Sequence, residues 1–157
     1  MSEPILYRHF GSKRDLYLAC LQSAWDGFRA ALDAKLEVRG DQDAVRAIGE
    51  GAREFHASGG VKPVTLWIQA VTEAGQDEAI AAFLRRQLRE VHDYIADVVR
   101  LGQAEGDVPG DRDADAEAWL FVGAAFLLSF ADRLGGLLTQ DDFAAIADQR
   151  HRWLTGA

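Results

Sequence analysis

The chain has 157 residues, of which 48% are hydrophobic and 27% charged, a balance typical of a soluble globular protein with its own core. Its formal net charge of −8 argues against nucleic acid as the partner of the whole surface, because acidic surfaces repel phosphate. The single cysteine, Cys20, excludes an intrachain disulfide and agrees with a reducing cytoplasm. Because Cys20 lies four residues after Leu16, helical spacing predicts a buried, unreactive thiol.

The first part of the chain, residues 1–11, has the pattern of a short helix followed by a glycine turn. Ser2 precedes a glutamate–proline pair, which is the arrangement of a helix N-cap with proline in the first turn. Leu6 and Phe10 lie four residues apart on one helical face, and Gly11 ends the helix before a second one begins. Such a pair of helices carries no catalytic chemistry but suits a helix lying in a groove of nucleic acid.

The segment LYRHFGSK at residues 6–13, followed by Asp15 and Leu16, resembles the end of the DNA-binding motif in the TetR family of bacterial transcriptional regulators. The resemblance implies a homodimeric repressor whose body binds a small effector that releases operator DNA. It places Glu3 and Arg8 near base edges, and Tyr7, His9 and Lys13 near the DNA backbone. The DNA-binding candidates are Ser2, Glu3, Tyr7, Arg8, His9 and Lys13.

The sequence also departs from the family pattern at its start. Family members carry a first helix and a positioning helix before this point, whereas this sequence begins at the recognition helix, so we expect an internal start. Ile5 stands where a threonine able to meet a phosphate is common. We expect residues 1–11 to be a partial DNA-binding motif and residues 12–157 a ligand-binding and dimerisation domain. The alternative is a truncated ligand-binding and dimerisation module that no longer binds DNA.

The remaining chain is predicted to be helical, since apolar residues recur at three- and four-residue spacing and β-branched residues are sparse. Asp41 is expected to cap the second of these helices, and Gly135 with Gly136 to separate the last two. The fold class that follows is all-α, a TetR-like helical bundle. The expected helices cover residues 12–38, 42–57, 63–74, 77–104, 113–134 and 140 or 141–154.

The helix expected over residues 113–134 is apolar on every face between residues 118 and 131. This fourteen-residue run is too short to cross a bilayer, so we expect a buried helix and no membrane partner. A second copy related by two-fold symmetry would cover such a helix, although it could instead be the central helix of a monomer. The resemblance implies that the last two helices form the dimer interface, for which the candidates are Trp119, Phe126, Phe130 and Phe143.

Aromatic residues with a few polar groups recur along the middle helices and suggest a cavity for a small apolar or aromatic effector. The same aromatic residues at helical spacing are also typical of an ordinary core, and both interpretations stay open. The effector-binding candidates are Trp25, Phe28, Phe55, His56, Trp67, Phe83 and His92.

The sequence contains little that indicates enzymatic chemistry. The four histidines lack the spacing of a metal site, and Cys20 has no base within its helical turn. His92-Asp93 beside Asp97 could in principle ligate a cation, but a solvated helix face is by far the favoured interpretation. We expect a cytoplasmic protein that is not an enzyme and that uses no cofactor and no metal.

Overall fold

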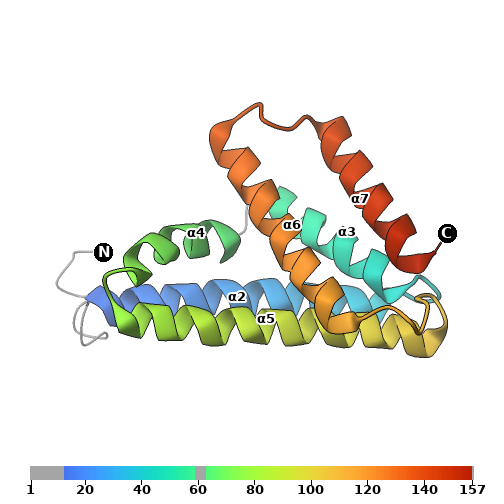
Figure 1. Ribbon diagram of the computed structural model, residues 1–157, viewed down its shortest axis with the longest axis horizontal. Coiled ribbons are helices and arrows are strands. Elements are labelled where there is room, and N and C mark those ends of the chain that lie inside the picture. The colour runs from blue at the N-terminus through green and yellow to red at the C-terminus, as the bar shows by residue number, and fades with distance from the viewer. Residues whose placement is uncertain (1–12, 59–62, 157) are drawn as a thin grey trace.

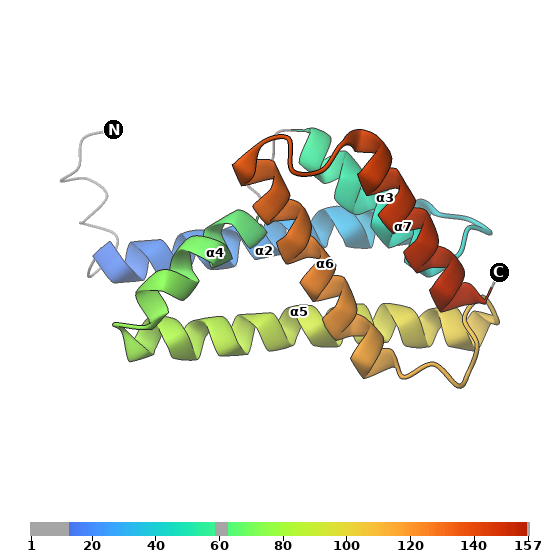
Figure 2. The ribbon, with the colours of Figure 1, turned by 45° about the horizontal axis from the view of Figure 1, so that its top comes forward.

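The computed structural model describes residues 13–58 and 63–156. The described ranges contain helices and no strand, so the prediction of an all-α fold is confirmed. The two longest helices, α2 and α5, lie side by side, and α6 crosses α5 while α7 lies beyond α3 (Figures 1 and 2). The helices are α2 (Lys13–Val38), α3 (Ala44–Ala57), α4 (Pro63–Ala74), α5 (Glu78–Glu105), α6 (Ala114–Leu134) and α7 (Gln140–Thr155).

Side-chain caps define where the helices begin. Asp77 accepts hydrogen bonds from the first backbone amides of α5, and Asp113 does the same for α6. Thr139 and Asp142 form a reciprocal capping box at α7. The prediction of Asp41 as the cap of α3 is wrong, because the carboxylate of Asp43 accepts the hydrogen bond from the Arg46 amide at 2.7 Å.

Two groups of buried side chains hold the helices together. The first lies between α2, α4, α5 and α6 and includes Leu21, Trp25 and Trp67. The second joins α2, α3, α5 and the start of α6, and it is completed by Leu154 of α7, which is fully buried. Burial of these apolar side chains is the main favourable contribution to folding.

One glycine of α5 permits the chain to return closely after this helix. A Cβ atom on Gly102 would lie 2.9 Å from Cγ2 of Val108, closer than packed carbon atoms approach. The carbonyl of Gly102 also accepts hydrogen bonds from the amides of Asp107 and Val108. The residue at position 102 therefore has to be small for the loop between α5 and α6 to pack.

The prediction of a buried Cys20 is wrong, since this thiol is exposed. The face of α2 that enters the core carries Leu21, Trp25 and Leu32. Cys20 precedes Leu21 by one residue, which rotates it about 100° away from that face.

Candidate functional site

Five of the six DNA-binding candidates lie outside the described residues: Ser2, Glu3, Tyr7, Arg8 and His9. The sixth, Lys13, is the first residue of α2, and its side chain is not among the described ones. The structure therefore leaves the DNA-binding candidates as predictions.

The beginning of α2 is attached to the beginning of α5 by an ion pair. Arg14 Nη1 lies 3.2 Å from Asp77 Oδ2, and both side chains are partly exposed. The hydrogen bond from Arg14, assisted by those from the backbone amides of Ala79 and Ile80, holds the pKa of Asp77 below its ordinary value. This contact connects the end of α2 nearest the predicted DNA-binding motif to the helix at the centre of the body.

Aromatic effector candidates from three helices meet in the first core. The ring centroid of Trp25 lies 6.2 Å from that of Phe28 and 6.3 Å from that of Trp67. Phe28 in turn contacts Phe55 of α3, at 5.1 Å and nearly perpendicular. Trp25 and Trp67 are 2% and 3% exposed, so their rings are in contact with protein on nearly all sides. The structure thus brings four of the candidates into one aromatic cluster, defined by Trp25, Phe28, Phe55 and Trp67.

A buried glutamine supplies a polar group to this aromatic cluster. Gln87 is 1% exposed, and its side-chain carbonyl accepts the hydrogen bond of the Trp67 indole. Its amide nitrogen lies 3.4 Å from Oε1 of Gln22, which leads outward to the surface of α2. Gln87 is not among the residues predicted from the sequence. Its position three residues after Leu84 and four before Val91 places it on the apolar face of α5, and a polar residue on such a face could have been noticed.

The other three effector candidates are distributed differently. Phe83 is buried in the first core, where Arg86 lies over its ring at 5.2 Å. His92 lies at the contact between α5 and α6, and its ring stacks on Trp119 at 4.5 Å. His56 has a side chain outside the described set. The structure therefore does not bring His92 to the aromatic cluster.

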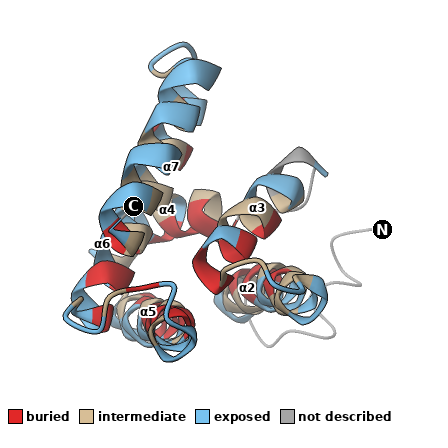
Figure 3. Cartoon of the chain, turned by 90° about the vertical axis from the view of Figure 1, so that its right-hand side faces the viewer, coloured by how far each residue is buried: buried red, intermediate tan, exposed pale blue. Residues whose placement is uncertain are grey.

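An exposed apolar row follows one side of α6, and Figure 3 shows the neighbouring α7 largely in the colour of exposed residues. The members of this row recur at alternating spacings of four and three residues, which is the repeat of helices that pack against another helix along their length. We call this row the α6 seam; it consists of Ala116, Leu120, Gly123, Leu127, Phe130 and Leu134.

The interface candidates on α6 divide between two faces of the helix. Phe130 belongs to the seam, and Trp119 lies beside it with 45% of its surface exposed. Phe126 points the other way, toward Trp67, with ring centroids 6.2 Å apart. The expected full burial of this helix is wrong for the single chain, because only 33% of its most apolar window is buried.

The length argument against a bilayer also fails for α6. The helix extends beyond the apolar run to Ala114–Leu134, and by length and composition it is the one helix within residues 13–58 and 63–156 that could cross a membrane. The absence of a membrane partner therefore stays a prediction that helix length does not support.

Long side chains connect α6 to α7. Arg150 Nη2 lies 2.6 Å from Oε2 of the buried Glu117, and the indole of Trp153 donates to Oε1 of Glu117 at 3.3 Å. Arg112 stacks on Trp153 at 4.6 Å. Trp153 is nevertheless 55% exposed, and Phe143, the interface candidate on α7, is half-buried. An open groove on α7, away from the aromatic cluster, is lined by Ala145, Ile146, Gln149, Arg150 and Trp153.

The chain is similar to an uncharacterized HTH-type transcriptional regulator, YezE, of Bacillus subtilis (strain 168). The two sequences are 28% identical over 115 residues, which make up 72% of this chain. The matched region spans 59% of the length of that relative. No family model and no solved structure matches the chain.

Proposed function

We propose that this chain is the sensing and dimerising part of a TetR-like transcriptional repressor of the cytoplasm. A small apolar or aromatic effector binds the body and favours a conformation whose two recognition helices are wrongly spaced for successive major grooves. Residues 1–13 supply contacts from the recognition helix to operator DNA.

The observation that carries this proposal is the agreement between two features of the sequence. The segment at residues 6–13 resembles a TetR recognition helix, and the chain is similar over 115 residues to an HTH-type regulator. A helix-turn-helix needs a first helix that crosses the DNA backbone, so DNA binding is tested with an upstream extension as well as with this chain.

DNA binding is tested with this chain and with a version extended upstream by the preceding in-frame sequence. The salt dependence of binding to DNA from the region upstream of the gene is measured for both proteins. We expect tight, steeply salt-dependent binding by the extended protein only, because phosphate contacts release counterions. An Arg8→Ala variant of the extended protein should lose sequence preference, whereas a Val71→Ala variant on the surface of α4 should not. Binding by neither protein would overturn the proposal.

Self-association is proposed to occur through the α6 seam and the adjoining surface of α7. The seam presents large apolar side chains to solvent, and Gly123 at its centre has open space around it, so another helix can approach its backbone. A second copy fits this surface better than a bilayer does, because α6 packs across α5 and carries the charged Glu117 pairing with Arg150. A self-complementary surface of this kind suits a two-fold dimer.

The dimer is tested by placing a charge on the seam. Leu127→Arg should weaken dimerisation by about a hundredfold, because a buried unpaired charge costs several kcal/mol and each 1.4 kcal/mol is tenfold. Val71→Arg, at a similarly exposed apolar position on α4, is the matched control and should leave dimerisation unchanged. Analytical ultracentrifugation measures both. Equal association of the two variants would contradict the assignment of the seam.

The effector site is proposed at the aromatic cluster with Gln87 as its polar group. Rings from α2, α3 and α4 converge there, and a side-chain amide amid such rings suits a planar aromatic ligand with one hydrogen-bonding group. Thermal-shift screening with indole, naphthol and benzoate tests this, since a ligand of the native state raises the unfolding temperature. Gln87→Leu should abolish the rise in unfolding temperature with these ligands, because each of them carries a hydrogen-bonding group. Responses that are unaffected by Gln87→Leu would place the ligand elsewhere.

The alternative function is a dimerisation module that does not bind DNA. The exposed seam favours it as well, because such a chain could capture full-length relatives in inactive heterodimers. Mixing this chain with the extended protein tests this capture, which should lower DNA binding in proportion to the added chain. Immunoblotting of the source cells discriminates the two functions, because the module requires the short chain to be the form that is present.

A further inference from the structure

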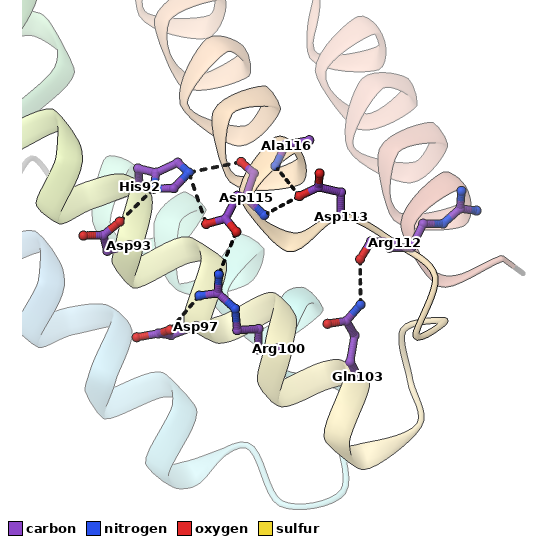
Figure 4. Close-up of polar contacts among 9 residues, drawn as sticks. All are labelled: His92, Asp93, Asp97, Arg100, Gln103, Arg112, Asp113, Asp115 and Ala116. Atoms are coloured by element: carbon purple, nitrogen blue, oxygen red, sulfur yellow. Dashed lines mark hydrogen bonds and ion pairs between the residues drawn. The ribbon is translucent and has the colours of Figure 1, made fainter.

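The contact between α5 and α6 contains a buried histidine whose two ring nitrogens both face oxygen atoms. His92 is 5% exposed. Its Nδ1 lies 2.9 Å from Oδ1 of Asp93, and its Nε2 lies 3.1 Å from the backbone carbonyl oxygen of Asp115 (Figure 4). Asp115 is in the first turn of α6, so the ring bridges the middle of α5 and the beginning of the next helix.

The protonation state of the ring decides how many of these hydrogen bonds can form. A carbonyl oxygen and an ionised carboxylate are acceptors only, and a neutral imidazole has a single N–H group. The neutral ring can therefore donate to Asp93 or to Asp115, while its other nitrogen presents a lone pair to an oxygen atom. The imidazolium form donates to both, and one of these two bonds then joins opposite charges.

Charged groups face His92 from both helices. On α5 the neighbouring charge is Asp93, and on α6 it is Asp115, whose Oδ1 lies 3.8 Å from Nε2. Arg100 binds the other oxygen of Asp115 at 2.8 Å and is shared with Asp97 at 3.0 Å (Figure 4). The site thus contains one arginine and the three carboxylates of Asp93, Asp97 and Asp115. No set of three or more side chains suited to hold a metal ion occurs in the part of the chain that the structure describes.

The second feature of the site is the indole stacked on this ring. The centroids of His92 and Trp119 are 4.5 Å apart, with the ring planes inclined by 32°. An imidazolium against an aromatic face gains a cation–π attraction that a neutral imidazole lacks. Trp119 precedes Leu120 of the α6 seam and is itself half-exposed, so its position forms part of the apolar surface.

We propose that His92 is a protonation-dependent latch between α5 and α6. As an imidazolium it ties the first turn of α6 to α5 and holds the indole of Trp119 against the body. Loss of the proton removes one of the two hydrogen bonds and the cation–π attraction, so raising the pH weakens the attachment of this turn and of the indole. The latch does not rest on the proposed function.

Four variants isolate the latch. Asp93→Asn replaces an acceptor by an amide that can donate to a neutral Nδ1, so both hydrogen bonds persist without the second ring proton. His92→Gln removes the titrating ring. His151→Gln is the matched control, because His151 lies 3.9 Å from a different carboxylate, that of Asp43 on α3. Trp119→Phe identifies the resonance of the reporting indole.

The experiment is fluorine NMR of the chain labelled with 5-fluorotryptophan, between pH 5.5 and 8.5. We expect the Trp119 resonance to shift with pH in the wild type and in His151→Gln, to shift less in Asp93→Asn, and to lose this shift in His92→Gln. The resonances of the buried Trp25 and Trp67 should stay unchanged, which excludes general unfolding. Nitrogen NMR of the His92 ring should change over the same pH range as the Trp119 resonance.

Three results would overturn the latch: a Trp119 shift that persists in His92→Gln, no shift in the wild type, or movement of all the indoles together. The measurement is repeated on Leu127→Arg. If the Trp119 resonance still shifts with pH in Leu127→Arg, the latch is supported whether or not the chain dimerises. If the wild type dimerises through the seam but its Trp119 resonance does not shift, the latch is overturned and the dimer is not.

Discussion

The four tryptophans of this chain divide between two regions that use the same residue in opposite surroundings. Trp25 and Trp67 lie in the first core and are almost completely covered by α2, α4, α5 and α6. Trp119 and Trp153, on α6 and α7, leave about half of their surface in contact with solvent. An apolar sequence therefore indicates that a surface will be covered, but it does not tell whether the same chain or another molecule covers it. Substitutions that compare the two regions can test this distinction.

The largest difference is expected between tryptophans of the two regions. Trp25→Ala should lower the free energy of unfolding by about 3–5 kcal/mol, because it leaves a cavity in the core. Trp119→Ala should cost less than about 1 kcal/mol in the monomeric Leu127→Arg background, since its side chain is half-exposed there. Urea denaturation measures both. Equal losses would show that the outer face of α6 is part of the folding core.

The next effect concerns the ion pair that joins the two outer helices. Arg150→Ala should destabilise the attachment of α7 by about 3 kcal/mol, because it leaves the buried carboxylate of Glu117 without its partner. The double variant Glu117→Gln with Arg150→Met should recover much of this loss, since no buried charge remains. Hydrogen exchange of the α7 amides provides the measurement. A double variant as unstable as Arg150→Ala would contradict the importance of the pair.

The same substitution at two glycines should have effects of opposite sign. Gly102→Ala places a methyl group against Val108 and should cost on the order of 1 kcal/mol, after the gain in helix propensity is subtracted. Gly123→Ala meets open space and should stabilise the monomer by about 1 kcal/mol. Thermal unfolding of dilute samples checks both signs. A destabilised Gly123→Ala monomer would mean that α6 is covered within the chain.

The smallest effect concerns the ion pair between Arg14 and Asp77, which makes the folding stability depend on pH in the acid range. Because Arg14 lowers the pKa of Asp77 in the folded state, this carboxylate adds stability above its unfolded pKa, and that stability is lost as the pH falls through the folded value. Asp77→Asn should therefore be less stable than the wild type at pH 7 and should lose less stability between pH 5 and pH 3. Asp41→Asn is the control, as this exposed residue caps no helix. Identical acid profiles of the wild type and Asp77→Asn would contradict the contribution.

The fold was largely predictable because helix signals in this chain are local. Pro63 marks the start of α4, and the glycines at 135 and 136 separate α6 from α7, as expected from the sequence. Two of the errors were shifts of one or two residues along the chain. Asp41 and Asp43 are equally good capping residues, and the actual helix start decided between them. Cys20 and Leu21 differ by one position, which is enough to exchange exposure for burial.

The candidate site was less predictable because its contacts join residues that are distant in sequence. Trp67 meets Gln87 across two helices, and His92 meets the carbonyl of Asp115, which any residue could provide. Aromatic residues could be recognised as a group from their spacing, but not which of them share a cluster. The α6 seam was visible as an apolar helix, whereas its exposed row emerged only when α4 and α5 had covered the other face.

The position of Leu154 has a consequence for the order of events during protein synthesis. This side chain completes the second core, in which the earliest buried residue along the chain is Leu32 of α2. The second core therefore cannot finish packing until α7 has left the ribosome. The first core needs no residue of α7 and can close earlier. Contacts between distant parts of a chain form slowly, and domains open during translation expose apolar surface. We therefore expect the nascent chain to fold from the α4 end and to depend on chaperones until α7 closes the other end.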